Sequence, residues 1–544
     1  MPTRLVPLWS APAPDPVRFN ETGPYLFDRD AVIVPDLRPG GFAVHDPVTG
    51  AVRRQAAPDA EIRDAPGVRI ANLLLFRVGG TPAVLVVHYV SERPGQLLVA
   101  QDLATGRRLW HRPVPPAVQS GSGAEVIAPD VAASGGTVLV VRDTDMEGLD
   151  ALTGQTRWRH TITTPCQIFV RTTPVALLLS TTLPNPPSRC EAEPRTAIYH
   201  PDTFAEVASW REQDEGIQSR PPIAADGTSI LPITTAGSDT ACSALLPDLK
   251  RLPSRCLDDP VAIAAHDDRL ISVAGAPDDE GGYPAQAWQT DSGRQLWSRR
   301  LNLYLGDVLL TSGHRYLVSD PLVGDERWLL PKFISLLDPV DGRMVVLPLD
   351  VTYLSTELLG AAAGMIFVRH VTPTGMRLTS YAPVVDGERE PVLGGPTADS
   401  WPDACQLLTP DDLDDVAAGY VAEPGRHDLP GVHFPQPNRC LLVPSDLAGV
   451  AVEVTVMWVA TEPAAAAALL DSEIAVYRDN QAPVVQLGPG VYQVSEYGSS
   501  DPTSAIIRVG AVVVHVQIGG HPELVPQVAS LVTQSMRGRL GLGP

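Results

Sequence analysis

Short apolar runs separated by polar turns fill the chain up to about residue 390. Residues 137–141, 269–273 and 365–368 are examples, rich in Val, Ile and Leu and too short for an ordinary helix. Runs of this kind, bounded by Gly, Pro, Asp and Thr, predict β-strands. No long segment here shows the three- and four-residue spacing of an amphipathic helix. We therefore expect a mainly β structure.

The turns between these runs carry a motif that recurs about every fifty residues, a spacing typical of repeat proteins. In its clearest copy, Asp150 precedes Gly154 by four residues and Trp158 by eight. The other close copies are Asp102, Gly106 and Trp110, and Gln289, Gly293 and Trp297. Looser copies run from Asp46 through Gly50 to Arg54, from Asp338 through Gly342 to Val346, and from Asp202 to Trp210.

Each copy predicts two strands joined by a tight turn, in which the glycine supplies a positive φ. The Trp is expected to lie flat against the neighbouring repeat. Three to four short strands per repeat predict a β-propeller blade. Two weak copies, near 243–248 and ending at 386–387, bring the count to eight blades, or to seven if one is only an insertion.

The segment Leu8-Trp9-Ser10 matches the end of a motif whose beginning is missing. We expect it to form the outer strand of the last blade, near 357–395. Such pairing would close the ring of blades and remove an open sheet edge.

The pattern LDxxTGxxxW at 149–158 resembles the repeat of pyrroloquinoline-quinone-like propellers. That family includes quinoprotein alcohol dehydrogenases and the propeller lipoprotein of the outer-membrane β-barrel assembly machine. The resemblance covers roughly residues 5–395 and implies the fold. It does not imply the quinone, because many members bind no cofactor.

A change of pattern after residue 395 predicts a second domain. We expect a propeller over 1–395, a linker over 396–404 and an α+β domain over 405–544. Residues 409–412 indicate a helix start, and 450–458 alternate as in a half-buried strand. An alanine-rich helix is expected from 461 to about 477, two strands around a glycine turn at 506–514, and a last helix from 522 to about 536.

The string Ala404-Cys405-Gln406-Leu407-Leu408-Thr409, with a second cysteine at Cys440 and a closing helix, is similar to a cysteine-bearing domain of actinobacterial lipoproteins. That resemblance implies residence in the cell envelope and no established chemistry.

Charge and hydropathy narrow the classes of partner. The net charge of −22 argues against nucleic acid, whose phosphates would be repelled. No stretch approaches the about 20 unbroken apolar residues of a membrane span. Residues 1–9 lack the basic and apolar regions of a signal peptide, so we expect membrane association only through an N-terminal anchor missing from this sequence.

The six cysteines fall into three local couples without metal-ligand spacing. The expected disulfides are Cys166–Cys190, Cys242–Cys256 and Cys405–Cys440. They indicate an oxidising, extracytoplasmic compartment. Six unrelated buried thiols, and hence a cytoplasmic protein, remain the alternative.

Three segments resemble ligand-binding sites, but none is expected to be one. Residues 143–148 begin like a calcium loop, but position twelve is Gly154 where a bidentate Glu is required. The glycine-rich residues 120–123 lack the lysine of a phosphate loop, and His427 and His433 fit surface positions. The adjacent Cys-Cys pair usual in quinoprotein dehydrogenases is absent.

We therefore expect no catalytic, cofactor-binding or metal-binding residues, and structural roles for the motif Asp, Gly and Trp residues. The favoured function is a non-catalytic scaffold of the cell envelope that docks a protein or peptide, of unknown identity, on propeller loops. The alternatives are a quinone-dependent dehydrogenase and an extracytoplasmic ligand sensor.

Overall fold

The computed structural model describes most of the chain between residues 1 and 540. The longer stretches outside the described residues are 14–24, 116–125, 183–194, 212–222, 275–282, 323–332, 386–395, 427–433 and 496–502, and gaps of one to five residues occur elsewhere. Over 210–267 and most of 302–333 only the backbone is described.

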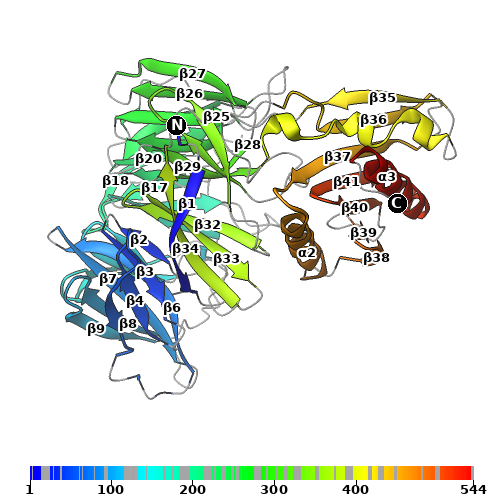
Figure 1. Cartoon of the computed structure of the whole chain (residues 1–544). Coiled ribbons are helices and arrows are strands. Elements are labelled where there is room, and N and C mark those ends of the chain that lie inside the picture. Colours follow the sequence, from blue (N-terminus) through cyan, green and yellow to red (C-terminus); the bar gives the residue numbers. More distant parts are fainter. Residues whose placement is uncertain are drawn as a thin grey trace.

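The described residues form eight small sheets before residue 386 and one seven-stranded sheet after 400 (Figure 1). We number the small sheets 1 to 8. Sheet 1 contains β2 (Leu26–Asp28), β3 (Ala31–Pro35), β4 (Phe42–His45) and β5 (Val52–Ala56), and sheet 2 contains β6 (Val68–Val78), β7 (Thr81–Val90), β8 (Gln96–Asp102) and β9 (Arg108–Val114). Sheet 3 contains β11 (Val131–Ser134), β12 (Thr137–Arg142), β13 (Asp145–Asp150) and β14 (Thr156–Thr161). Sheet 4 contains β10 (Val126–Ile127), β15 (Gln167–Thr172), β16 (Leu177–Thr182), β17 (Arg195–Tyr199) and β18 (Glu206–Arg211).

The second half continues in the same way. Sheet 5 contains β19 (Ile223–Ala225), β20 (Thr228–Thr234), β21 (Thr240–Leu246), β22 (Lys250–Arg251) and β23 (Leu257–Asp258), and sheet 6 contains β24 (Pro260–His266), β25 (Arg269–Ala274), β26 (Tyr283–Gln289) and β27 (Gln295–Leu301). Sheet 7 contains β28 (Tyr304–Leu310), β29 (Leu317–Leu322), β30 (Phe333–Leu337) and β31 (Met344–Pro348), and sheet 8 contains β32 (Ser355–Ala362), β33 (Met365–Thr372), β34 (Gly375–Val384) and β1 (Arg4–Pro12).

Contacts between strands join sheets 1 to 4 to one another, and sheets 5 to 8 to one another. β2 contacts β6, β6 contacts β11, and β11 contacts β15. β19 contacts β24, β24 contacts β28, and β28 contacts β32. The first strand of sheet 8 also contacts that of sheet 1, because β32 lies against β2. This arrangement brings the two ends of the series together, as in a propeller.

The N-terminal strand completes sheet 8. β1 runs antiparallel to β34, with Trp9 opposite Ser380. The pairing expected for the segment around Trp9, in the last sheet near 357–395, is therefore confirmed. Arg377 strengthens the contact by donating from Nε to Ser10 Oγ at 2.8 Å.

Two weak motif copies are aligned differently from the prediction. In sheet 4 the turn closes between His200 and Phe204, whose φ is +54°, so His200 and not Asp202 occupies the first motif position. Ala208, opposite Ile198, then occupies the Trp position, and Trp210 lies two residues beyond it. The eight-residue step from Asp202 to Trp210 was thus coincidental.

In sheet 7 the outer strand lacks the bulge found after the other motif turns. Leu336 pairs with Val345, whereas Gly148 of sheet 3 pairs with Trp158 across a register shift. As a result Val345 packs in the cluster shared with sheet 8, and Val346 is buried in the cluster of the C-terminal sheet. The assignment of Val346 to the Trp position was wrong.

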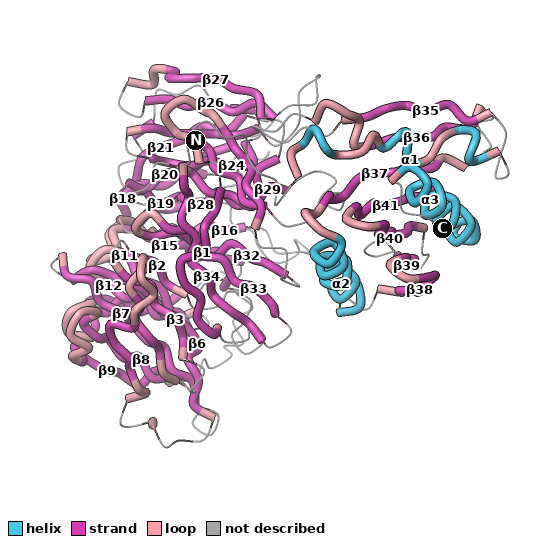
Figure 2. The backbone as a smooth tube through the Cα atoms, viewed as in Figure 1, coloured by secondary structure: helices cyan, strands magenta, loops and turns pink. Residues whose placement is uncertain are grey.

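The C-terminal sheet has the strand order β35-β36-β37-β41-β40-β39-β38, and all its neighbouring strands are antiparallel. Its strands are β35 (Tyr420–Gly425), β36 (Arg439–Pro444), β37 (Val452–Val459), β38 (Val484–Gly488), β39 (Val491–Val494), β40 (Ser504–Val509) and β41 (Val512–Ile518). The helices are α1 (Ala404–Leu407), α2 (Pro463–Asp479) and α3 (Val525–Arg539), with short 3-10 turns η2 (Ala398–Ser400), η3 (Pro410–Leu413) and η4 (Pro522–Leu524). Figure 2 shows that the helices of the described residues lie in this part.

Three details of this part differ from the sequence-based expectation. Trp401 and Ala404 are buried in the core of the C-terminal sheet, so the segment expected as a linker packs as part of that unit. The expected helix start at Thr409 opens only a 3-10 turn. The strand β37 is buried on both sides beyond Glu453, because it lies between β36 and β41 and beneath helices.

Candidate functional site

The motif tryptophans join successive sheets. Each indole Nε1 donates to a backbone carbonyl in the turn of the next sheet, always to the residue after the first motif position. The pairs are Trp9 to Pro47 (3.0 Å), Trp110 to Ala151 (2.8 Å), Trp158 to Pro201 (2.8 Å) and Trp297 to Pro339 (3.0 Å). The repeat thus places the same hydrogen bond at four seams between sheets.

The motif glycines make room for these rings. A Cβ on Gly154 would lie 2.6 Å from Trp110 Cδ2, and one on Gly342 would lie 2.7 Å from Trp297 Cε3. Both glycines also have positive φ, of +69° and +72°. Each glycine therefore permits both the positive φ of its turn and the close approach of the Trp ring from the preceding sheet.

One seam replaces the tryptophan with an arginine. Arg54 lies over Gly106, where an added Cβ would be 2.2 Å from Arg54 Nη1. Its guanidinium also lies 5.3 Å from the centre of the Phe42 ring. Burial lowers the pKa of Arg54, opposed by the charge of Asp102.

The motif aspartates cap their own turns. Asp102 Oδ1 accepts from the backbone N–H and the hydroxyl of Thr105, both at 2.7 Å, and these bonds hold the pKa of Asp102 below its ordinary value. Asp150 accepts likewise from Thr153, and Asp338 from the N–H of Val340. These carboxylates are therefore engaged in the turns themselves.

A buried carboxylate lies at the seam between sheets 2 and 3. Glu147 accepts from Arg112 Nη2 at 2.8 Å, from Arg159 Nε at 3.0 Å and from Thr156 Oγ1 at 2.5 Å. Burial alone raises the pKa of Glu147, but these hydrogen bonds and the charge of Arg112 outweigh it and lower the pKa. The sequence pattern alone did not indicate this cluster.

A recurring signal could have revealed part of it. Arg112 and Arg299 both stand two residues after a motif Trp. Arg112 donates to the carbonyl of Gly154, and Arg299 donates to that of Asp341. The spacing Trp-x-Arg therefore marks a second contact to the next turn.

A second charged group lies near the seam between sheets 8 and 1. Arg369 of β33 forms an ion pair with Glu357 of β32, and Tyr25 is buried nearby. Burial raises the pKa of Tyr25 to about 12, opposed by the charge of Arg369. The phenol therefore stays neutral at physiological pH and serves as packing with a polar end.

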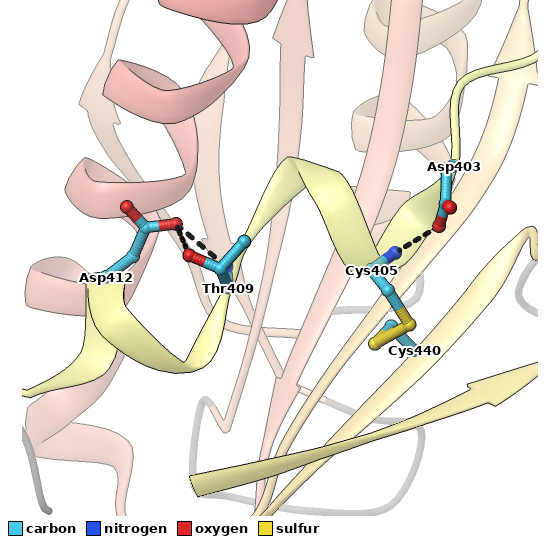
Figure 3. Close-up of a disulfide and its surroundings, with 5 residues drawn as sticks. All are labelled: Asp403, Cys405, Thr409, Asp412 and Cys440. Atoms are coloured by element: carbon cyan, nitrogen blue, oxygen red, sulfur yellow. Dashed lines mark hydrogen bonds between the residues drawn. A yellow bond between two sulfur atoms is a disulfide. The ribbon is translucent and has the colours of Figure 1, made fainter.

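One expected disulfide falls within the described residues. Cys405 of α1 is bonded to Cys440 of β36, and the Cys405 N–H donates to Asp403 Oδ1 at 2.9 Å (Figure 3). Thr409 and Asp412 hydrogen-bond beside it through Thr409 Oγ1 and N. The side chains of Cys166, Cys190, Cys242 and Cys256 lie outside the described residues, as do those of Trp210, His427 and His433 and residues 120–123.

The described residues contain neither a metal-binding cluster nor a membrane-spanning helix. Within the described ranges, no group of three or more His, Cys, Asp or Glu side chains is arranged to hold a metal ion. In the same part of the chain, no helix has both the length and the apolar character needed to cross a membrane.

The contact of Gly154 with Trp110 predicts that an alanine costs more stability at Gly154 than at Gly80. Replacing Gly154 by Ala should lower the free energy of unfolding by about 2–4 kcal/mol, because it adds a clash with Trp110 to the cost of a positive φ. Gly80 is the matched control: its φ is +85°, but nothing lies within 4 Å of an added Cβ. Gly80→Ala should therefore cost only about 1 kcal/mol. Equal losses in denaturant titrations would show that Trp110 does not clamp the turn.

The Cys405–Cys440 bond predicts a second effect. Replacing both cysteines by serine frees a loop with a sequence separation of 35 residues. The chain-entropy relation then predicts a loss of about 4 kcal/mol in stability. Thermal unfolding of the double variant measures the loss, and mass spectrometry of non-reduced peptides tests all three expected pairs. Free thiols in protein from its native compartment would contradict the pairing.

Sheets of four to five strands, joined by Trp over Gly from one turn to the next, are the arrangement of a propeller-like repeat protein. Residues 7–172 match the family model described as outer membrane protein assembly factor BamB. This match, over less than half of the chain, makes residues 7–172 similar to a pyrroloquinoline-quinone-like repeat protein. No curated protein sequence matches the chain significantly.

Solved structures of propellers also align with the chain. BamB from Moraxella catarrhalis is 15% identical, with a TM-score of 0.38, and the match covers 71% of this chain and 99% of that one. A quinohemoprotein alcohol dehydrogenase from Pseudomonas putida HK5 is 12% identical, with a TM-score of 0.36 and coverage of 74% and 80%. Similarities this low carry no conclusion about function.

Proposed function

We propose that this protein is a non-catalytic scaffold of the cell envelope that docks a segment of another envelope protein on its propeller. The eight small sheets would form one eight-bladed ring, followed by the C-terminal unit as a separate domain. The family model matched by residues 7–172 describes an outer-membrane assembly factor and supports this class of role.

The observation that carries the proposal is a set of apolar side chains exposed at the motif turns. Val48, Leu152 and Val340 stand two residues after the first motif position, and their exposed fractions are 45%, 54% and 56%. Because each follows the third strand of its sheet, all three lie at the same end of the ring. Rigid, exposed apolar groups at one end suit contact with another chain.

The turns hold these side chains in fixed positions. The N–H of Val48 and that of Leu152 each lie 3.0 Å from Oδ1 of the preceding Asp46 or Asp150. The N–H of Val340 lies 2.8 Å from Asp338 Oδ1. A surface already ordered before binding loses little conformational entropy when a partner docks.

Site-specific photo-crosslinking in the producing cells tests this surface. A photoreactive residue at Val48, Leu152 or Val340 should crosslink to the same envelope protein. The matched controls are Val52 and Val207, which are 56% and 42% exposed but lie in outer strands. Equal crosslinking from turns and outer strands, or none from the turns, would contradict docking on the turns themselves.

The rival dehydrogenase is tested separately. Added pyrroloquinoline quinone and calcium should give no alcohol- or sugar-dependent dye reduction. The enzyme would need a quinone clamped between flat surfaces, a calcium ion and a proton-accepting aspartate. Asp102, Asp150 and Asp338 are engaged in turn caps. Stoichiometric quinone binding in calorimetry with calcium-dependent activity would overturn the scaffold in favour of the enzyme.

A further inference from the structure

The motif copy in sheet 3 carries a charge that the other copies lack. Glu147 stands three residues before the first motif position, Asp150. The corresponding residues in sheets 1, 2, 4, 6 and 7 are Ala43, Val99, Ala197, Gln286 and Ser335. Because these sheets form without a charge at that position, the repeat itself does not require Glu147 or the groups that compensate for its burial.

Three arginines surround Glu147 where sheet 3 faces sheet 2. Arg112 comes from β9, Arg142 from β12 and Arg159 from β14. Arg112 and Arg159 donate to Glu147 Oε1, and Arg142 Nη2 lies 3.7 Å from Glu147 Oε2. Asp145, opposite Arg142 in the strand ladder, is exposed and accepts from a threonine hydroxyl. In this arginine cluster the guanidinium groups therefore outnumber the carboxylates by one.

Two of the arginines keep donors that Glu147 does not use. Arg159 donates to Glu147 through Nε, and its side chain is 70% exposed. Arg142 comes no closer to Glu147 than 3.7 Å, and its Nε is buried without a hydrogen-bond partner. The planar fork of N–H groups on a guanidinium matches the two oxygens of a carboxylate. A second carboxylate at this cluster would therefore find donors from both arginines.

We propose that the arginine cluster binds a carboxylate side chain from an acidic segment of the docked partner, an inference that rests on the scaffold function proposed above. The cluster and the exposed Leu152 belong to the same hairpin, β13 and β14. Arg112 joins them, because it also donates to the carbonyl of Gly154 in the turn of that hairpin. The partner segment would thus carry an apolar residue for Leu152 and an acidic residue for the arginines.

Charge complementarity confines an acidic segment to a local site. With a net charge of −22, the protein as a whole repels an acidic chain. At an ionic strength of about 0.15 M this repulsion is screened beyond about 8 Å, whereas contacts in a partly buried cluster are screened less. An acidic peptide should therefore bind where guanidinium groups are in excess and depend on individual arginines there.

Calorimetric titration of the full chain with a hexaglutamate peptide at this ionic strength tests the site. Hexaglutamate should bind, and hexaglutamine of the same length should not. Arg159→Gln should weaken the binding by on the order of tenfold, because it removes charge-assisted hydrogen bonds. Arg108→Gln is the matched control, since it removes the same charge from an outer strand where Arg108 pairs with Asp59. It should leave the affinity unchanged.

A variant of opposite sign strengthens the test. Asp145→Asn removes the exposed carboxylate beside Arg142 and should raise the affinity for hexaglutamate. Melting temperatures of the variants check that each retains its fold. No binding of hexaglutamate, or equal weakening by Arg108→Gln and Arg159→Gln, would overturn the proposal. Inorganic phosphate that binds as tightly as the peptide would overturn it too, because the cluster would then hold a free oxyanion.

Photo-crosslinking from Leu152 in the producing cells separates this site from the scaffold function. Combining Arg142→Gln with Arg159→Gln should reduce the crosslink to the envelope partner. A crosslink of unchanged yield would refute the acidic contact and leave docking on the turns intact. No crosslink from the protein with its arginines unchanged would contradict docking itself, and with it the acidic partner, even where hexaglutamate binds.

Discussion

Deleting residues 1–14 should lower the free energy of unfolding by several kcal/mol. The deletion removes β1, leaves β34 as an open edge and takes away the partly buried Trp9, whose loss should cost part of the about 3–5 kcal/mol of a fully buried Trp. Trp9 stacks on His45 with ring centres 5.5 Å apart and donates to Pro47, so its loss also opens the seam between sheets 8 and 1. Denaturant titration of the truncated protein measures the change.

Two point variants distinguish the contribution of the Trp9 side chain from that of the rest of β1. Trp9→Ala should account for most of the loss, whereas Leu8→Ala should change stability by less than about 0.5 kcal/mol. Leu8 is 43% exposed on the same strand. An unchanged melting temperature after the deletion would refute ring closure by β1.

The repeat could be predicted because the interactions that define it join residues close together in the sequence or in the next repeat. The glycine with positive φ, the aspartate that caps the turn and the tryptophan eight residues later all act within one hairpin and the next one. The copy in sheet 4 was misaligned because Phe204 adopts the positive φ that sequence analysis reserves for glycine. Its ring stacks on Tyr199 and lies 4.5 Å from that of His160, so tertiary contacts hold a backbone conformation that phenylalanine rarely adopts.

The charged contacts between neighbouring sheets could not be predicted from the sequence, for a different reason. Glu147 and Arg112 are 35 residues apart and belong to different sheets. No periodicity links them, since their contact depends on how sheets 2 and 3 pack. Val346 shows the same limit: it stands eight residues after Asp338, yet the missing bulge turns it toward the core of the C-terminal sheet.

Acidification from pH 6.5 to pH 4 should destabilise the protein through two buried histidines. Burial lowers the pKa of His88 to about 4, opposed by Asp59, and lowers that of His370 to about 3. His88 is 2% exposed, and His370, which contacts the Tyr381 hydroxyl through Nε2 at 3.0 Å, is 0% exposed. Both side chains are therefore neutral in the folded protein at pH 5.

The sign of the effect follows from proton binding. Between the ordinary histidine pKa of 6.5 and the lowered values, the unfolded chain binds protons that the folded chain does not. Stability contributed by the neutral histidines is complete above pH 6.5 and falls as the pH decreases. The slope is at most about 1.4 kcal/mol per pH unit for each histidine. The carboxylates with lowered pKa, Glu147 and Asp150 among them, lose their contribution at more acid pH.

Urea titrations at several pH values between 4 and 7 measure this slope. His370→Gln should remove the contribution of about one titrating proton from the slope of stability against pH, because Gln does not titrate. His88→Gln should remove a similar contribution. His521→Gln is the matched control, since the His521 side chain is 46% exposed. A slope that survives both substitutions, or one that His521→Gln abolishes, would show that other groups govern the acid sensitivity of this propeller.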